Sequence, residues 1–560
     1  MPGTNNAFRR FLTSRWFRRF WYSMIILFFL LFVLIPSTFV LSHLISGWDK
    51  ISAEVLGDGQ MISTISNGIM TSFKLAGAVT IIDFIAGLPM AWLLNRGHFK
   101  GRRYLDTLID LPLVVPTSAL GFSVALFWAT PGGFAFFFNS PTGAITSSFI
   151  LLMLVHVAFS YPYMVRTLSA SLEEIDITYE IAGRTLGASP LTAIRTITLP
   201  LFRGGIVSGT ILSFGRSISE TGATVLALSI VGASQADGTA PVLIAGWRKL
   251  INEGGSMAEK YITASAFTSV LLIILALVLL TLVMIIIKKF KLPIKKVWPA
   301  QEKMLSGRIF KYLRDASSNI FLILAVLIPA FFIFIFFFRG LAQGNSLAGI
   351  DLAGFLNSLF ASFLIASIVT VVNMGLGIPM AILIARKKAG TVTQPLDVLI
   401  NIPMIIPSTA LGFSLGLFWS GIGGGLSSLA NADFLLIVLA HIAFTYPFIV
   451  RTVSSAISDI DISFEEAART LGANPLQVFR KIIFPLAKPS IMAGAIMMFA
   501  RSLGETGATL AVASTAVTTP VYIVKLVNEN ALFEAALACI ILIGISYIIL
   551  MGLRRLSSGK

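Results

Sequence analysis

The chain has 560 residues, of which 56% are hydrophobic and 12% are charged, and its mean hydropathy is +0.87. This composition excludes a soluble globular protein and indicates a protein of the lipid bilayer. The formal net charge of +16 does not point to nucleic acid as a partner, because the basic residues stand in short clusters between apolar segments, as topology determinants do. The single cysteine, Cys539, excludes an intrachain disulfide and a thiolate metal cluster.

The first half of the chain predicts six membrane spans. A basic segment, residues 1–21, precedes an apolar run that is too long for a signal peptide and lacks a cleavage site, so we interpret the run as a retained span with a cytoplasmic N-terminus. Residues 22–288 form the first predicted half. Its spans are expected near residues 21–44, 67–95, 104–129, 148–168, 204–230 and 261–287.

The second half repeats this pattern after a basic linker, residues 289–318. Residues 319–560 predict spans near 319–338, 356–385, 396–420, 433–453, 488–512 and 530–552. We therefore expect an all-α polytopic membrane protein with two tandem six-helix halves and about twelve transmembrane helices in total. The basic loops, the polar segment 169–203 and both termini are all predicted on the cytoplasmic side.

The two halves share long matching patterns, which excludes coincidence. Arg216 with the run Glu220 to Thr224 recurs as Arg501 with the run Glu505 to Thr509. His156 with Tyr161-Pro162 recurs as His441 with Tyr446-Pro447, and Leu111-Pro112 through Trp128 recurs as Ile402-Pro403 through Trp419. An even number of spans in each half makes the repeats parallel, with the transport pathway expected between them.

Two polar segments, residues 176–200 and 461–485, are near-copies of each other within this apolar chain. We predict a helix, a break and a second helix in each. In the second copy, Ser463 and Glu466 predict a capping box, Gly472 a turn with positive φ, and Asn474-Pro475 a new helix start. The first copy has Thr178, Ile181, Gly187 and Ser189-Pro190 at these positions, and Pro200 and Pro485 are expected to close the second helices.

These segments resemble the cytoplasmic signature loop of the permease subunits of ABC importers that work with a solute-binding protein. In the second copy the pattern falls on Glu466, Ala467, Ala468, Gly472, Ile482 and Pro485, with Phe484 in place of leucine. In the first copy it falls on Ala182, Gly187, Ile197, Leu199 and Pro200, while Ile181 and Gly183 depart from it. The duplication is similar to the fused permeases of iron(III), thiamine and aminoethylphosphonate uptake. Residues 111–122 and 501–509 are more similar to sulfate and molybdate permeases.

This resemblance implies a transmembrane permease for a small solute, an inorganic or phosphonate-type anion, in the cell (inner) membrane. Its loops would be coupling helices that dock on an ABC ATPase, present in two copies, while an extracytoplasmic solute-binding protein delivers the solute. The implied ATPase-coupling residues are Ala182, Gly183, Gly187, Glu466, Ala467, Ala468 and Gly472. A hairpin that only connects two spans is the alternative. Because Ile181 replaces the glutamate, substituting Glu466 is expected to reduce transport more than substituting Ile181.

The sequence contains no site that would convert energy by itself. It lacks a G-x-x-x-x-G-K-[ST] run, so we expect no cofactor in this chain, ATP on the partner subunit, and no enzymatic activity or catalytic residue. The four histidines lack metal-ligand spacing, and His156 and His441 are interpreted as packed or hydrogen-bonded side chains within spans.

Charged residues within predicted spans mark a candidate pathway or gate. Arg216 with Glu220, and Arg501 with Glu505, either stabilise their spans as i,i+4 ion pairs or act in a gate or in attracting an anion. Prolines 112, 116, 403 and 407 interrupt their spans, so that Thr117, Ser118, Ser408 and Thr409 are candidate pathway residues; simple kinking is the alternative.

Two other classes of function are possible: a channel or membrane-scaffold protein, which would not need the repeated docking loops, and a secondary transporter of the major-facilitator type. The latter would also show two parallel six-span halves, and residues 97–103 end in Gly-Arg-Arg as in that family's loop. Residues 386–388 of the second half lack this motif, however, and the long polar loops lie elsewhere.

Overall fold

The computed structural model describes residues 15–97, 99–255, 257–289, 299–346, 351–386, 393–421, 432–513 and 517–558. Within these ranges the secondary structure is entirely helical. Ten helices are long and apolar enough to cross a membrane, or twelve if each of two bent pairs counts as one span. The predicted all-α polytopic fold with about twelve spans is therefore confirmed. The predicted basic N-terminus and linker lie partly outside the described residues.

The first repeat begins with α2 (Arg15–Phe28), η1 (Phe29–Leu34) and α3 (Ile35–Thr38), which contain its first span, Arg19–Thr38, and continues with α4 (Val40–Ser46). The other helices of this repeat are α5 (Trp48–Lys50), η2 (Ile51–Leu56), α6 (Gly59–Arg96), α7 (Arg102–Val114), α8 (Thr117–Ala129), η3 (Phe134–Phe138), α9 (Ser148–Glu173), α10 (Thr178–Thr185), α11 (Pro190–Ala193), η4 (Ile194–Thr198), α12 (Leu199–Leu201), α13 (Arg203–Ile218), α14 (Gly222–Ile230), η5 (Gln235–Asp237), α15 (Ala240–Glu253) and α16 (Ala258–Lys289).

The second repeat follows the same order after a linker helix, α17 (Pro299–Leu305). Its helices are α18 (Arg308–Phe321), η6 (Leu322–Leu327), α19 (Ile328–Ala342), α20 (Leu352–Arg386), α21 (Thr393–Leu399), α22 (Ile402–Ile405), α23 (Ser408–Gly421), α24 (Ala432–Asp459), α25 (Ile462–Thr470), α26 (Pro475–Val478), η8 (Phe479–Ile483), α27 (Phe484–Leu503), α28 (Gly507–Val512), α29 (Thr519–Asn528) and α30 (Leu532–Ser558).

Four prolines sit just after a wide, π-helical turn. Pro36, Pro200, Pro329 and Pro485 each stand at the start of the helix that follows η1, η4, η6 or η8. The wider turn leaves room for the proline ring, which would clash with the preceding turn of an α-helix. The prediction that Pro485 closes a helix is therefore wrong, because residues Pro475–Leu503 form one span. In the first repeat the chain bends by 70° between Leu201 and Arg203.

Four predicted spans are interrupted near their middle. The segments 104–129 and 396–420 break at Pro116 and Pro407, the second with a bend of 106°. The segments 204–230 and 488–512 break at residues 219–221 and 504–506, where no proline stands. Each break exposes backbone groups that need partners from another helix.

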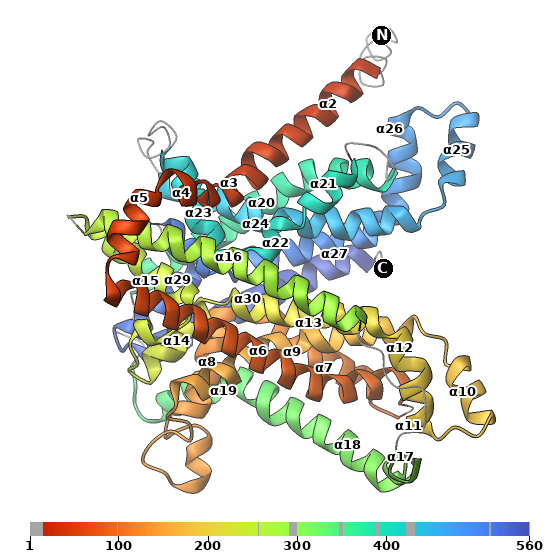
Figure 1. Cartoon of the computed structure of the whole chain (residues 1–560), viewed down its shortest axis with the longest axis horizontal. Coiled ribbons are helices and arrows are strands. Elements are labelled where there is room, and N and C mark those ends of the chain that lie inside the picture. Colours follow the sequence, from red (N-terminus) through yellow and green to blue (C-terminus); the bar gives the residue numbers. More distant parts are fainter. Residues whose placement is uncertain are drawn as a thin grey trace.

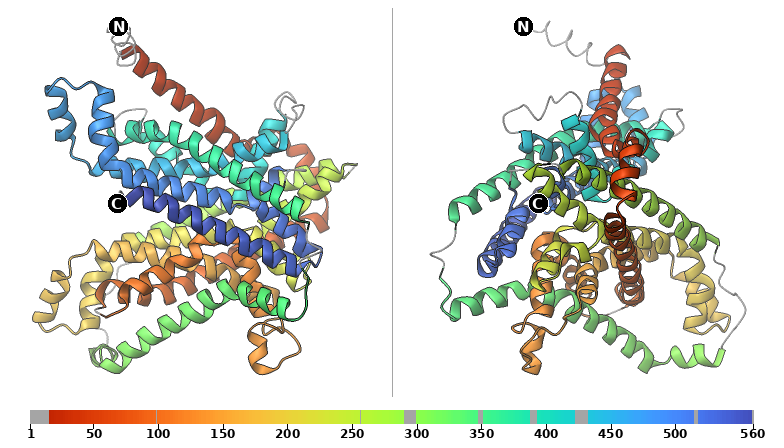
Figure 2. Two further views of the ribbon diagram at one scale, coloured as in Figure 1. Left: turned by 180° about the vertical axis from the view of Figure 1, so that it is seen from behind. Right: turned by 60° about the vertical axis from the view of Figure 1, so that its left-hand side comes forward.

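The first span of each repeat packs against the other repeat (Figures 1 and 2). The Ser414 hydroxyl on α23 donates to the Pro36 carbonyl (2.7 Å) and accepts from the Val40 amide (2.9 Å). In the matching contact, Ser123 on α8 donates to the Pro329 carbonyl (2.7 Å) and accepts from the Ile333 amide (2.9 Å). Residues 22–288 and 319–560 are thus repeats in sequence, but neither is a separately packed unit.

The polar segments of both repeats lie at one end of the molecule (Figure 1). Helices α10 to α12 and α25 to α26 project there, and the start of α2, the end of α30 and the linker helix α17 lie at the same end. Helices α5, α14 and α15 lie at the opposite end. We call the segments 176–200 and 461–485 the first and second elbows.

Candidate functional site

An aspartate stands at the start of the first helix of each elbow: Asp461, not the predicted Ser463, is the N-cap of α25, and Asp176 directly precedes Ile177, the N-cap residue of α10. Asp461 Oδ1 accepts a hydrogen bond from the Ser463 amide (2.9 Å), and Asp176 Oδ1 accepts one from the Thr178 amide (2.8 Å). The bond from the Ser463 amide lowers the pKa of Asp461 below its usual range, and hydrogen bonds from the Thr178 hydroxyl and then its amide lower the pKa of Asp176. The predicted capping box is therefore wrong: the chain enters α25 two residues earlier, and the side chain of Glu466 is exposed.

The predicted glycine turns end the first helix of both elbows. Gly187 and Gly472 have φ angles of 89° and 83°, which residues with a Cβ rarely adopt. The next helix begins at Ser189 in the first elbow, whose hydroxyl accepts from the Thr192 amide (3.3 Å). In the second elbow, Asn474 and Gln477 form a complete capping box that the sequence analysis missed, although the Asn-Pro-x-Gln spacing signals it.

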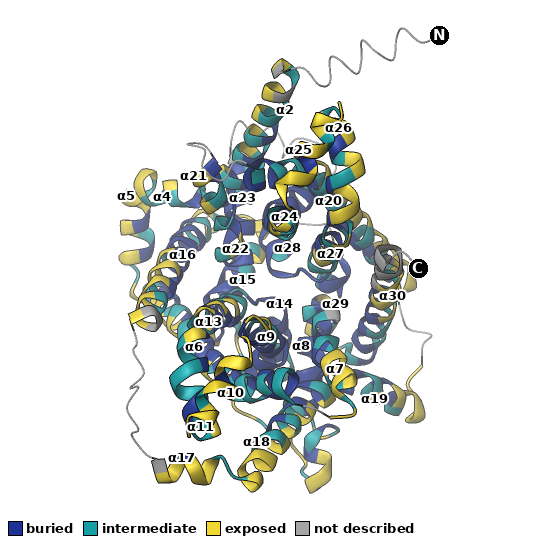
Figure 3. Cartoon of the chain, turned by 90° about the vertical axis from the view of Figure 1, so that its right-hand side faces the viewer, coloured by how far each residue is buried: buried dark blue, intermediate teal, exposed yellow. Residues whose placement is uncertain are grey.

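Both elbows present apolar side chains to solvent. Leu186 and Leu471 are each 89% exposed, and Ile181 and Phe464 are 49% and 57% exposed. All predicted coupling residues lie on these elbows. Ala182, Gly187, Glu466, Ala467 and Gly472 are exposed, and Gly183 and Ala468 are half-buried. Figure 3 shows the exposed elbow helices from their own end of the molecule. Exposed apolar groups on an otherwise polar projection indicate a protein docking surface.

A buried glutamate anchors each elbow to the membrane helices. Glu465 is 2% exposed, and its Oε1 lies 2.7 Å from Nε of Arg386 at the end of α20. Glu180 is 9% exposed and lies 3.3 Å from Nε of Arg96 at the end of α6. Neither glutamate was predicted from the sequence. Their signal was a glutamate four residues after the capping aspartate in each copy.

The linker helix α17 packs on the first elbow. Glu302 is 6% exposed; it lies 2.7 Å from Nε of Arg195 and accepts a hydrogen bond from the Thr192 hydroxyl. Ser306 Oγ accepts from the Leu191 amide (3.3 Å). At the position of Arg195, the second elbow has Arg480, which is exposed. The two elbows are therefore held differently.

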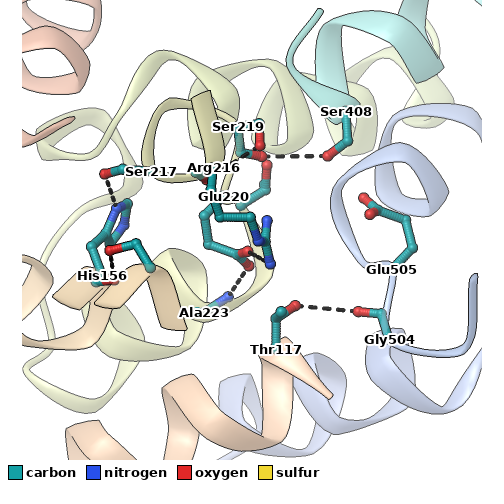
Figure 4. Close-up of polar contacts among 12 residues, drawn as sticks. Thr117, His156, Arg216, Ser217, Ser219, Glu220, Ala223, Ser408, Gly504 and Glu505 are labelled. Carbon is teal, nitrogen blue, oxygen red and sulfur yellow. Dashed lines mark hydrogen bonds and ion pairs between the residues drawn. The ribbon is translucent and has the colours of Figure 1, made fainter. Parts of the chain in front are cut away.

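The span breaks of the two repeats meet where the repeats contact each other (Figure 4). The Thr117 hydroxyl donates to the Gly504 carbonyl (3.2 Å), and the Ser408 hydroxyl donates to the Ser219 carbonyl (3.3 Å). The hydroxyls of Thr221 and Thr409 are hydrogen-bonded to each other. Hydroxyl groups of one repeat thus pair with backbone carbonyls and a hydroxyl group in the breaks of the other repeat.

Two glycines let the repeats approach at this point. A Cβ on Gly222 would lie 2.5 Å from the Thr506 Cβ, and a Cβ on Gly507 would lie 2.7 Å from Oγ1 of both Thr221 and Thr409. The predicted pathway residues Thr117, Ser408 and Thr409 are thus brought to one seam between the repeats. Ser118 is fully buried beside them, and its hydroxyl has no partner among the described residues.

The predicted ion pairs form, but their glutamates lie outside the helices. Arg216 Nη2 is 2.7 Å from Glu220 Oε2, and Arg501 Nη1 is 2.8 Å from Glu505 Oε2. The other glutamate oxygens accept from backbone amides at the starts of α14 and α28, at 3.2 and 3.0 Å. Each glutamate therefore fastens the helix after the break to the helix before it.

Arg216 keeps hydrogen-bond donors available within the seam. The side chain of Arg216 is 10% exposed and its guanidinium lies 4.9 Å from the Phe159 ring centre. Its Nε and Nη1 atoms have no hydrogen-bond partner among the described residues. In the second repeat, Arg501 lies 5.4 Å from the Phe444 ring centre, and its side chain is 18% exposed.

The span histidines are fully hydrogen-bonded, in line with their interpretation from sequence. His156 contacts Ser217 Oγ through Nδ1 (2.8 Å) and Thr224 Oγ1 through Nε2 (2.9 Å), which bridges the break between α13 and α14. His441 makes the same two contacts in the second repeat. Within the described ranges, no group of three or more histidine, cysteine, aspartate or glutamate side chains could hold a metal ion.

Both repeats match one known protein family. Residues 84–291 and 377–559 each match the family described as binding-protein-dependent transport system inner membrane component. The chain belongs to this family. It carries the domain of this inner membrane component twice, so the tandem permease resemblance is confirmed, and the protein is a multi-pass membrane protein of this family.

The chain is similar to curated members named for sulfate and molybdenum transport. It is 32% identical over 172 residues to the sulfate transport system permease protein CysT of Salmonella typhimurium, which covers 31% of this chain and 61% of the relative. It is 33% identical over 227 residues to the probable sulfate transport system permease protein cysT of Chlorokybus atmophyticus (40% and 77%). It is 34% identical over 171 residues to the molybdenum transport system permease protein ModB of Escherichia coli (29% and 71%).

Proposed function

We propose that this protein forms the translocation pathway of an ABC importer for a small inorganic oxyanion. The observation that carries the proposal is the pair of elbows, which project from one end of a duplicated inner membrane component and expose apolar faces. Each elbow would dock on one copy of an ATPase that binds the ATP, and a solute-binding protein would deliver the anion to the opposite end. The elbows and both termini would then lie in the cytoplasm.

Two observations support an oxyanion as the substrate. The relatives described above are named for sulfate and molybdenum transport, which favours an inorganic oxyanion over a phosphonate. Two buried guanidinium nitrogens of Arg216, Nε and Nη1, also have no hydrogen-bond partner among the described residues at the seam between the repeats. Guanidinium groups bind tetrahedral oxyanions well because their donors match the oxygen spacing.

The seam would act as the gate. Its closure depends on direct contacts between the repeats, such as Thr117 with Gly504 and Ser408 with Ser219. A rocking motion of the repeats driven by the elbows would break these contacts together and open a path beside Arg216 and Arg501.

The function is tested by uptake into proteoliposomes that contain this chain and an ABC ATPase that co-purifies with it. We expect uptake of radioactive sulfate or molybdate that requires ATP on the elbow side and the solute-binding protein on the other side. ATP-independent uptake by the chain alone would instead favour the secondary-transporter alternative.

Docking is tested by replacing Leu186 and Leu471 with aspartate. We expect both substitutions together to abolish co-purification of the ATPase, because a charge in an apolar interface is not compensated. The matched control is Tyr104→Asp, an exposed residue (79%) outside the elbows, which should leave co-purification intact. Uptake that survives in the double variant Arg216→Ala and Arg501→Ala would contradict the proposed role of these arginines in attracting the anion.

A further inference from the structure

A cavity of about 590 Å³ lies between α2, the end of α20 and the second elbow. It is within the usual size range of small-molecule sites. Three arginines line it: Arg19 on α2, Arg386 at the end of α20, and Arg469 on α25. They come from three different elements, so the cavity exists only because these elements converge.

The cavity carries excess positive charge. Glu465 is the acidic group in its lining, and its two oxygens are shared between Arg386 (2.7 Å) and Arg469 (3.3 Å). Three arginines against one glutamate leave two positive charges in excess. Arg19 is exposed, and the side chain of Arg469 is 58% exposed, so both can reach an anion within the cavity.

The remaining wall of the cavity is apolar and belongs to membrane spans. Leu383 on α20, with Phe479 and Ile483 in the turn that leads into α27, supplies this wall. Arg19 begins one candidate span and Arg386 ends another, so these two arginines lie at span ends, where the membrane surface is expected, and Leu383 lies three residues further inside its span. Tyr22, an interfacial type of residue, lines the same cavity.

This charge pattern is particular to the cavity at the second elbow, which combines α2 of the first repeat with residues of the second repeat. The equivalent prolines Pro36 and Pro329 align the two first spans, and this alignment places Tyr312 at the position of Arg19. In the first elbow, Glu180 pairs with Arg96 and accepts from Thr198, and Ile483 stands at the Thr198 position in the second. The equivalent place at the first elbow therefore has one arginine fewer and one more polar group.

We propose that the cavity binds an anionic phospholipid. Its phosphate would be held by Arg19 and Arg469, and the upper part of its acyl chains would lie against Leu383 and Phe479. Basic pockets between spans at the cytoplasmic surface bind such headgroups. A bound lipid would join the first span to the second elbow, and this binding does not depend on the substrate proposed above.

The experiment is native mass spectrometry of the intact full-length chain in detergent with added phosphatidylglycerol. We expect one phosphatidylglycerol to bind in preference to phosphatidylcholine, and the double variant Arg19→Gln and Arg469→Gln to weaken its affinity about tenfold or more, since each surface arginine adds attraction to an anionic headgroup. The matched control is Arg184→Gln, which stands at the Arg469 position in the first elbow and should leave binding unchanged.

Two further arms make the outcome decisive. The variant Arg19→Lys with Arg469→Lys keeps the charges and should retain most of the preference, which separates lost binding from lost folding. Glycerol phosphate, which lacks acyl chains, should fail to displace the lipid at equal concentration. The proposal is overturned if Arg184→Gln weakens binding as much as the double variant, if phosphatidylcholine binds equally well, or if glycerol phosphate displaces the lipid.

Discussion

Neighbouring glutamates in the second elbow have opposite environments. Glu466 carries the family pattern and is exposed, whereas Glu465 is buried against Arg386. Glu466 was assigned to ATPase coupling because it matches the family pattern. The pattern alone does not show which of two adjacent glutamates is buried against the membrane helices. That choice is set by Arg386, which lies 79 residues earlier in the chain.

We predict that Glu465→Gln destabilises the protein by about 3 kcal/mol, because the partly buried Arg386 loses its charged partner. Thermal unfolding in detergent, followed by tryptophan fluorescence, measures this loss. The control Glu466→Gln should change stability by less than about 0.5 kcal/mol, since that side chain is exposed. Equal losses in both variants would refute the structural role of Glu465.

The stability of the start of α25 is expected to depend on pH because of its capping aspartate, Asp461. The pKa of Asp461 is lowered in the folded state by its hydrogen bond to the Ser463 amide, so the cap stabilises α25 above the ordinary aspartate pKa of about 3.9. This stabilisation is lost as the pH falls through the lower, folded-state pKa. Hydrogen exchange of the Ser463 amide, corrected for intrinsic rates, should therefore accelerate only in acid. In Asp461→Asn this acid-dependent step should be absent; an unchanged step would contradict the assignment.

Each elbow could be predicted in outline because its signals are local. The Gly187 and Gly472 turns and the Asn474-Pro475 start involve residues within one turn of each other, and all three are present in the structure. The breaks at Pro116 and Pro407 were also visible locally. The breaks at residues 219–221 and 504–506 were not, because they contain no proline and are stabilised by hydroxyl groups from the other repeat.

The brace between α17 and the first elbow was likewise invisible in the sequence, where the linker reads as a basic loop. We predict that Glu302→Ala loosens only the first elbow, at a local cost of about 3 kcal/mol, because Arg195 loses its buried partner. Limited trypsin digestion should then cut the first elbow faster than in the unmodified protein. Arg480→Ala is the matched control in the second elbow and should leave digestion of the first elbow unchanged. Faster cutting in both variants would argue against a specific brace.

At the scale of the whole molecule, the first span of each repeat packs against the other repeat and so holds the two together. We call these the exchanged first spans. The apolar sequence predicted these spans but not the helices that they pack against. Those contacts are long-range: Ser123 bonds to the Pro329 carbonyl across 206 residues, and Ser414 bonds to the Pro36 carbonyl across 378 residues. The family pattern therefore identified two repeats correctly, while their packing had to come from the structure.

This exchange predicts that the connection between the repeats is dispensable once the protein has folded. A protease site placed between residues 289 and 299 should allow cleavage in detergent without separating the fragments on size-exclusion chromatography. Ser123→Leu together with Ser414→Leu should weaken the association of the cleaved fragments, since the four hydrogen bonds of these hydroxyls are lost. Fragments that separate at once without these substitutions would contradict the role of the exchanged spans.

The Ser123 contact also sets an order of events during synthesis. When α8 leaves the ribosome, the segment that will cover it has not yet been translated, and 206 further residues must be made before Pro329 appears. At a translation rate of roughly 5 to 20 residues per second, this delay is about 10 to 40 s. For that time the nascent first repeat stands in the bilayer with one flank open to lipid or to an insertion chaperone.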